Sequence, residues 1–220
     1  MTELGAHAVR SHRRAVPLLA AAAAAAGIVG GVAFELLQRT HAAAPALPEL
    51  NGQAVWAAGA RPAPDFSLRD QNGALVSLHG LRGRTVLLAF LDSKCHSSCP
   101  IVGRQLGSVL RRLPAASRPA LLVVSVDQKG DTPAGIRTAL RKWRLAGAWP
   151  VHWVNAPTHA QLARVWKRYG IVVQPTTNDI VHSLALYLID RHGDERTAYL
   201  FPFLQSFVQH DLTKLAQERA

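Results

Sequence analysis

Two cysteines, four positions apart in Cys95-His-Ser-Ser-Cys99, are the only cysteines of the 220-residue chain. A thiolate attacks disulfides and binds soft metal ions, and a helix N-terminus with positive charge nearby lowers the pKa of a thiol. Pro100 suits the first turn of a helix, and Lys94 and His96 flank the first cysteine. We therefore expect both sulfurs to ionise more readily than a free cysteine.

Their spacing leaves several chemistries open. A single close pair cannot be the disulfide framework of a small secreted domain, which uses four to eight cysteines. Cys95 and Cys99 can instead converge on one turn, where they oxidise to a redox-active disulfide or share a metal ion. They could also be two buried structural residues. A structural zinc site needs four ligands, and few candidates lie near this loop, whereas thiolates with an imidazole suit copper.

A strand and a helix are expected to position the pair. Residues 86–91 form a continuous apolar run, typical of a strand buried on both faces, and they lead directly into Cys95. After Pro100, apolar residues recur at helical spacing, which predicts a helix. The cysteines thus lie at a strand-to-helix junction, where α/β folds place their sites.

The remaining pattern predicts one α/β domain with no internal repeat. Asn72-Gly73 between alternating segments predicts a β-hairpin over 65–78. Strands are expected at 121–126, 183–189 and 197–201, and helices from Thr132, over 158–169 and over 205–217. The order is hairpin, strand, helix, strand, helix, helix, strand, strand, helix, with a parallel pair joined by a crossover.

The N-terminal fifty residues predict attachment to a membrane. Residues 15–34 carry no charge, and arginines precede them. Twenty residues just span a hydrocarbon core, so we expect 1–14 in the cytoplasm, a transmembrane anchor at 15–36, a linker at 37–63 and the domain at 64–220. The domain would face the periplasm or an equivalent space from the inner membrane. A cleaved signal peptide, cut near residues 42–44, is the alternative, which the length disfavours.

The net positive charge of the chain indicates which kinds of partner it can bind. Lys and Arg outnumber Asp and Glu by 25 to 14, which favours anionic partners such as membrane headgroups and acidic protein faces. Nucleic-acid binding is not expected, because the chain has no zinc-finger spacing or RNP-type aromatic run and its arginines are scattered.

Three motifs, in order, resemble the Sco/SenC family of copper-binding proteins. They are Cys95-x3-Cys99-Pro100 after an apolar strand, Ser125-Val-Asp127-x3-Asp131-Thr-Pro133, and Val181-His182-Ser183 followed by Leu186-Tyr-Leu-Ile-Asp190-x2-Gly193. The resemblance implies a thioredoxin-like α/β fold with an N-terminal β-hairpin, preceded by one transmembrane helix. It also implies a role in assembling the dinuclear copper centre of cytochrome c oxidase.

Carried over to this chain, the resemblance implies that Cys95, Cys99 and His182 bind copper, a donor set suited to Cu(I). Asp127 follows a strand, where it would either orient the site or cap the next helix. The family usually has Thr before and Pro after the first cysteine, whereas this chain has Lys94 and His96. His96 is either an extra ligand or a loop residue facing solvent. The histidines expected simply at the surface are His79, His152, His159, His192 and His210.

Two functions of different class follow. The first is a copper metallochaperone that serves the copper-accepting subunit of cytochrome c oxidase, with a periplasmic copper donor or thiol reductant as a further partner. The second is a membrane-anchored thiol-disulfide oxidoreductase or peroxiredoxin-like reductase. Such enzymes commonly have Cys-x2-Cys and place Pro and Thr before the late strand, where this chain has His182-Ser183. Pro175-Thr176 would be a displaced version. The sequence favours copper binding, and the two roles can coexist.

Overall fold

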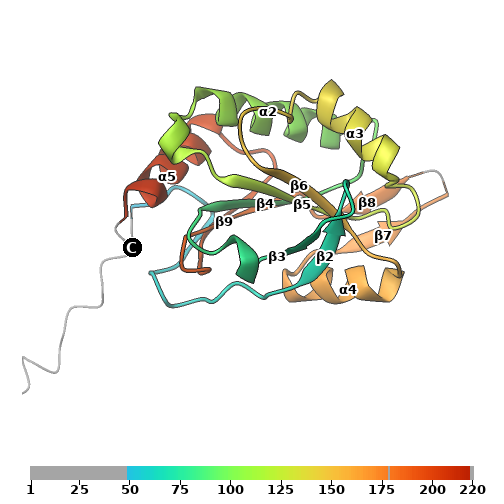
Figure 1. Ribbon diagram of the computed structural model, residues 1–220, viewed down its shortest axis with the longest axis horizontal. Coiled ribbons are helices and arrows are strands. Elements are labelled where there is room, and N and C mark those ends of the chain that lie inside the picture. Colours follow the sequence, from blue (N-terminus) through green and yellow to red (C-terminus); the bar gives the residue numbers. More distant parts are fainter. Residues whose placement is uncertain (1–48, 178, 219–220) are drawn as a thin grey trace, which may run out of the picture. The chain divides into compact units, whose positions relative to one another are not determined.

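The computed structural model describes residues 49–177 and 179–218. An eight-stranded mixed sheet lies between helices on its two faces (Figure 1). The segments expected as cytoplasmic tail, membrane anchor and most of the linker fall outside the described residues. Within the part that is described, no helix is both long and apolar enough to cross a membrane.

Three parallel strands form the centre of the sheet: β4 (Val86–Leu91), β5 (Ala120–Ser125) and β6 (Val151–Asn155). Every residue of β4 and β5 is buried, as their unbroken apolar runs predict. Because parallel strands end at the same edge, the loops after β4 and β5 are neighbours. Those loops carry the cysteine pair and Asp127.

Antiparallel strands extend the sheet on both sides. β9 (Ala185–Ile189) pairs with β4, β10 (Glu195–Leu200) with β9, and β1 (Ala54–Val55) with β10. Beyond β6 lies the predicted hairpin of β2 (Ser67–Asp70) and β3 (Leu75–Ser77). Its turn contains Gly73 at φ +83°, a conformation that favours glycine.

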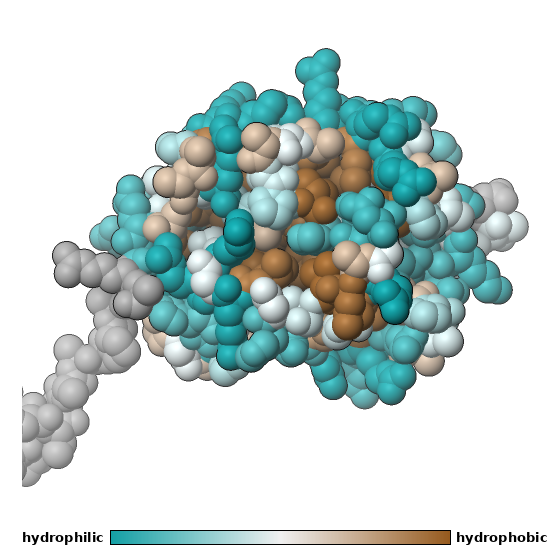
Figure 2. Space-filling model, in the orientation of Figure 1, coloured by the Kyte–Doolittle hydropathy of each residue, from teal (hydrophilic) through white to brown (hydrophobic). Residues whose placement is uncertain are grey.

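Helices α2 (Cys99–Arg112), α3 (Pro133–Lys142) and α5 (Gln205–Gln217) pack on one face of the sheet, and α4 (His159–Arg168) packs on the other. The side chains of Thr132 and Thr158 cap α3 and α4. Two short 3-10 helices complete the set, η1 (His79–Leu81) and η2 (Ala115–Ser117). Figure 2 shows mostly hydrophilic residues around the rim of the view and an apolar area in its middle.

Four strands lie where the sequence predicted none. The predicted order omits β6, because Val-His-Trp-Val-Asn alternates polar and apolar residues only briefly and directly follows Pro150. It also omits the hairpin of β7 (Val173–Pro175) and β8 (Ile180–His182), which forms a separate two-stranded sheet. β1 is only two residues long. None of these segments shows periodicity over enough residues to predict a strand.

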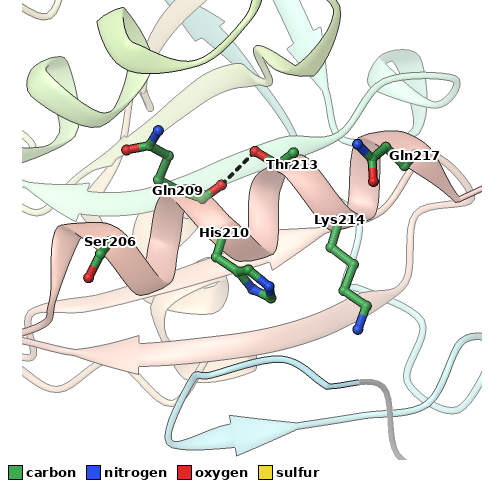
Figure 3. A pocket seen from close by; sticks show the side chains of 6 residues that line it. All are labelled: Ser206, Gln209, His210, Thr213, Lys214 and Gln217. Atoms are coloured by element: carbon green, nitrogen blue, oxygen red, sulfur yellow. Dashed lines mark hydrogen bonds between the residues drawn. The ribbon is translucent and has the colours of Figure 1, made fainter.

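Residues 49–63 were expected in the linker but belong to the folded domain. β1 pairs with β10, and the Asn51 side-chain amide donates to Asp211 Oδ1 at 2.6 Å. His210 and Lys214 of α5 contact this segment, at 3.0 Å from Asn51 and 3.1 Å from Glu49, and both line a pocket of about 590 Å³ on the outer face of the helix (Figure 3). The Ala- and Pro-rich composition predicted a tether because it does not reveal partners in β10 and α5.

Asn51 attaches the first residues of the domain to α5. Its backbone and side-chain N–H groups donate to Asp211, whose carboxylate is fully buried and needs donors. We predict that Asn51→Ala lowers the free energy of unfolding by about 1–2 kcal/mol, measured by urea denaturation. Gln53→Ala, which removes a 3.2 Å contact at an exposed position, should change it by less than about 0.5 kcal/mol. Equal effects of the two substitutions would contradict the docking of this segment.

Candidate metal centre

The cysteine pair lies at the predicted junction. β4 ends at Leu91, a loop follows, and α2 begins at Cys99 with Pro100 in its first turn. Cys99 is fully buried, whereas Cys95 retains 9% exposure. Both are free thiols in this structure, which is the reduced state of the pair.

Cys95 is surrounded by hydrogen-bond donors. The backbone N–H of Cys99, at the start of α2, donates to Cys95 Sγ at 3.4 Å, and Ser97 Oγ lies 3.5 Å from the same sulfur. A hydrogen bond from the Cys99 thiol, with smaller contributions from Ser97 and the backbone, lowers the pKa of Cys95 to about 4 despite partial burial. Cys95 is therefore the thiolate of the pair.

Cys99 behaves in the opposite way, which corrects the expectation that both sulfurs ionise readily. Its hydrogen bond to Cys95 and its burial raise the pKa of the Cys99 thiol. A proton on Cys99 stabilises the neighbouring thiolate, so the first ionisation makes the second unfavourable. The position of Cys99 at a helix N-terminus does not outweigh these two effects.

His182 reaches this pair from the end of β8. Its Nε2 lies 3.4 Å from Cys99 Sγ, and its Nδ1 lies 3.1 Å from the backbone oxygen of Ser183. A carbonyl oxygen can only accept, so Nδ1 carries the ring proton and the neutral ring presents the Nε2 lone pair to Cys99. Burial lowers the pKa of His182, which favours this neutral form.

Pro175-Thr176 is separated from the late strand β9 because the residues between them form the turn and second strand of the hairpin β7–β8. Pro175 pairs with Ile180 across the hairpin, and His182 pairs with Val173. The hairpin lies between α4 and β9 in the chain, and its second strand ends with His182 against Cys99. Pro175 is exposed on this hairpin, while His182 occupies the position beside the cysteines.

The three predicted ligands are thus brought together through Cys99. Within the described ranges, however, no set of three His, Cys, Asp or Glu side chains is already gathered closely enough to hold a metal ion. With bonds like those of zinc, about 2.3 Å to sulfur and 2.0 Å to nitrogen, two ligands of a trigonal ion stand about 3.7 Å apart. The 3.4 Å contact of Cys99 with His182 is close to that separation. Binding would require Cys95 to close on the same point.

Acidic residues behind the loop hold it in place, and sequence reasoning gave two of them no role. Asp131 is buried and accepts from the Ser93 N–H at 2.8 Å and from the Ser125 hydroxyl, which ties the cysteine loop to β5. Asp92 is also buried and accepts from the Lys94 N–H at 2.7 Å. Both follow apolar strands at the same sheet edge, a signal that could have identified them.

Asp127 has a local structural contact. Its Oδ1 accepts from the Gly130 N–H at 2.7 Å, which shapes the turn before α3, whereas Thr132 caps that helix. Burial, with a smaller effect of the Asp127 charge, raises the pKa of Asp92. Asp127 therefore contacts the turn and acts electrostatically on the cysteine loop.

The other histidines are exposed as expected, with one exception. His79, His96, His159, His192 and His210 are exposed. His152 is not a plain surface residue, because its Nδ1 lies 3.0 Å from the buried carboxylate of Asp70. It lies on β6, the central strand that the sequence pattern did not predict.

Comparison with known proteins points to one family. The sequence profile of the SCO1/SenC family matches residues 57–217. A protein of Stutzerimonas stutzeri described as copper-binding is 29% identical over 143 residues, which cover 62% of this chain and 68% of that protein.

Solved structures show the same fold. ScoI of Arabidopsis thaliana with copper bound has a TM-score of 0.63 at 16% identity, covering 71% of this chain and 99% of that one. BsSco, a member of the Sco family of cytochrome c oxidase assembly proteins, has a TM-score of 0.64 at 17% identity, covering 76% and 100%. The mixed α/β, thioredoxin-like fold expected from the sequence is confirmed.

Asp131 can be tested through the pH dependence of stability. Burial raises its folded-state pKa to about 6 from its usual 3.8, so its ionisation disfavours the folded state. Its contribution is most favourable below about pH 4 and is lost as the pH rises through about 6. Asp131→Asn keeps an acceptor for Ser93 but has no carboxyl group to ionise. We predict that its free energy of unfolding, relative to that of the parent, rises by about 1–3 kcal/mol when the pH is raised from 4 to 7.5, measured by metal-free urea titrations at both pH values.

Asp131→Ala is the comparison variant, because it removes the acceptor and leaves the Ser93 N–H without a partner. It should be less stable than Asp131→Asn at both pH values. A pH-independent difference between parent and Asp131→Asn would contradict the raised pKa.

Proposed function

The chain belongs to the SCO1/SenC family, and on that premise we propose that it is a copper metallochaperone whose ligands are Cys95, Cys99 and His182. One observation supports these ligands above all. His182, 83 residues away in sequence, presents Nε2 to Cys99 Sγ at 3.4 Å. An imidazole with its lone pair facing a thiol at the start of a helix is a pair of soft-metal donors already oriented toward each other.

The donor chemistry fits copper. Two sulfurs and one neutral imidazole suit Cu(I), and binding would release the Cys99 proton. The Ser183 carbonyl fixes the ring of His182, and Asp131 fixes the loop that carries Cys95. We assign Asp127 a supporting role through the turn beside that loop. The copper-binding relatives and the copper-bound Sco structure support the same metal.

The recipient in this proposal is the copper-accepting subunit of cytochrome c oxidase. The support is the fold shared with BsSco, a member of a family of cytochrome c oxidase assembly proteins. A copper donor or a thiol reductant in the same compartment would complete the cycle. The relative burial of the ligands suits transfer, because Cys95 retains 9% exposure whereas Cys99 is fully buried.

A thiol-disulfide reductase is the second candidate, favoured by the free pair with its one ionised thiol. The Cys95 thiolate would attack a target disulfide and release one target thiol. Cys99, losing its proton, would then attack Cys95, release the second thiol and leave a Cys95–Cys99 disulfide. The target is reduced by two electrons and the pair is oxidised by two. In a chaperone this reaction would prepare target cysteines for copper.

Copper binding can be tested on the full-length chain with its cysteines reduced. We predict one copper per chain, and His182→Ala should weaken the affinity about 100-fold or more, because even residues behind a ligand contribute 10- to 100-fold. Competition with a chromophoric Cu(I) chelator measures this. His96→Ala, at an exposed position of the same loop, is the control and should keep the parent affinity.

The same variants separate the two candidates. A reductase would show insulin or peroxide turnover that survives His182→Ala and disappears with Cys95→Ser. If His182→Ala bound copper as tightly as the parent and left such turnover intact, the metallochaperone proposal would fail. If His96→Ala alone weakened binding, the third ligand would be misassigned.

We also propose that residues 15–36 anchor the protein in the inner membrane, with the domain in the periplasm or an equivalent space. The uncharged run and the preceding arginines support this. The full-length chain should remain in the membrane fraction after carbonate extraction, whereas a chain starting at residue 47 should be released. Recovery of the full-length chain in the soluble fraction would contradict an anchor.

A further inference from the structure

A cleft of about 520 Å³ opens beside Cys95, between α2 and α3. The cysteine loop, residues 93–96, lines the cleft, and so do Ala139 and the buried Trp143. A Cβ on Gly103 would lie 2.7 Å from the Trp143 ring, so the glycine lets α2 and this ring approach closely. The site contacts described above do not use this space.

The cleft is lined by positive charge. Lys94, Arg104 and Lys142 all line it and all are exposed, and no Asp or Glu is among the described lining residues. None of the three takes part in a salt bridge among the described residues. The first turns of α2 and α3 also border the cleft, and their backbone N–H groups add partial positive charge. The preferred occupant is therefore an anion.

The lining follows the helices and does not converge on one point. Pro100 and Arg104 are one turn apart on α2, while Gly135, Thr138 and Lys142 form a stripe along α3. Seven residues of helix span about 10 Å, which matches about three residues of extended chain. A peptide segment fits this elongated shape better than a compact anion does.

Cys95 lines this cleft, whereas Cys99 does not. A segment lying in the cleft would thus meet Cys95, the less buried cysteine of the pair. We propose that the cleft binds an extended acidic segment of the protein that exchanges copper or thiols with Cys95. This inference rests on the proposed function and specifies how its partner is recognised.

The test uses two synthetic peptides of equal length, each with one internal disulfide, flanked by glutamates in one and by lysines in the other. The full-length chain, reduced and copper-free, should exchange with the glutamate peptide about 10-fold faster or more at low salt. The rates should converge as salt screens the charges. Arg104→Glu with Lys142→Glu should abolish or invert the preference.

The matched control is Arg164→Glu with Lys167→Glu, two exposed residues of α4 on the opposite face of the sheet. It changes the net charge equally and should keep the preference. An unchanged preference in the Arg104/Lys142 variant would overturn the proposal. An equal loss in both variants would also overturn it, because net charge alone would then explain the rates.

Failure of this inference is distinguishable from failure of the proposed function. The exchange assay contains no copper, and copper binding by the Arg104/Lys142 variant is measured separately and should equal that of the parent. Intact copper binding with no charge preference would reject only the docking cleft. A charge preference without copper binding would reject the chaperone and keep the cleft.

Discussion

The contact between Cys99 and His182 is the interaction on which the candidate metal site depends, and the elements of the fold meet its requirements. It joins residues 83 positions apart and requires each to be delivered by a different element. The buried strand β4 must lead through a short loop into α2, and the hairpin β7–β8 must bring the chain to that end of the sheet. Cys99 is fully buried, and its thiol proton is held beside two acceptors, Cys95 Sγ and His182 Nε2. The chemistry of all three residues follows from that shared proton.

Local sequence patterns predicted part of the candidate site. The apolar run of β4, the proline after Cys99 and the helical spacing of α2 lie within about thirty residues, so the strand-to-helix junction could be predicted from the sequence. The place of His182 came from resemblance, because nothing in its neighbours predicts a contact with Cys99. β6 and β7–β8 are too short to show periodicity. The raised pKa of Cys99 depends on burial by distant segments, and for that reason the expectation of two reactive thiols was wrong for one.

Charges of opposite sign lie at different depths around the site. Asp92 and Asp131 are buried behind the cysteine loop and accept its backbone N–H groups, so they act through position. Lys94, Arg104 and Lys142 are exposed in front of it. Burial raises the pKa of both carboxyl groups, so ionising them behind the loop lowers the stability of the folded state. The exposed cations cost little to keep, since water solvates them.

The described chain starts and finishes at one end of the sheet, near α5, and the hairpin β7–β8 lies at the other (Figure 1). Asn51 and Asp211 fasten the starting segment there. The candidate ligands meet toward the hairpin end, because His182 ends β8 and contacts Cys99. A label or solid support joined to the first or last described residue would therefore lie at the opposite end of the sheet from the hairpin and leave the thiols unobstructed.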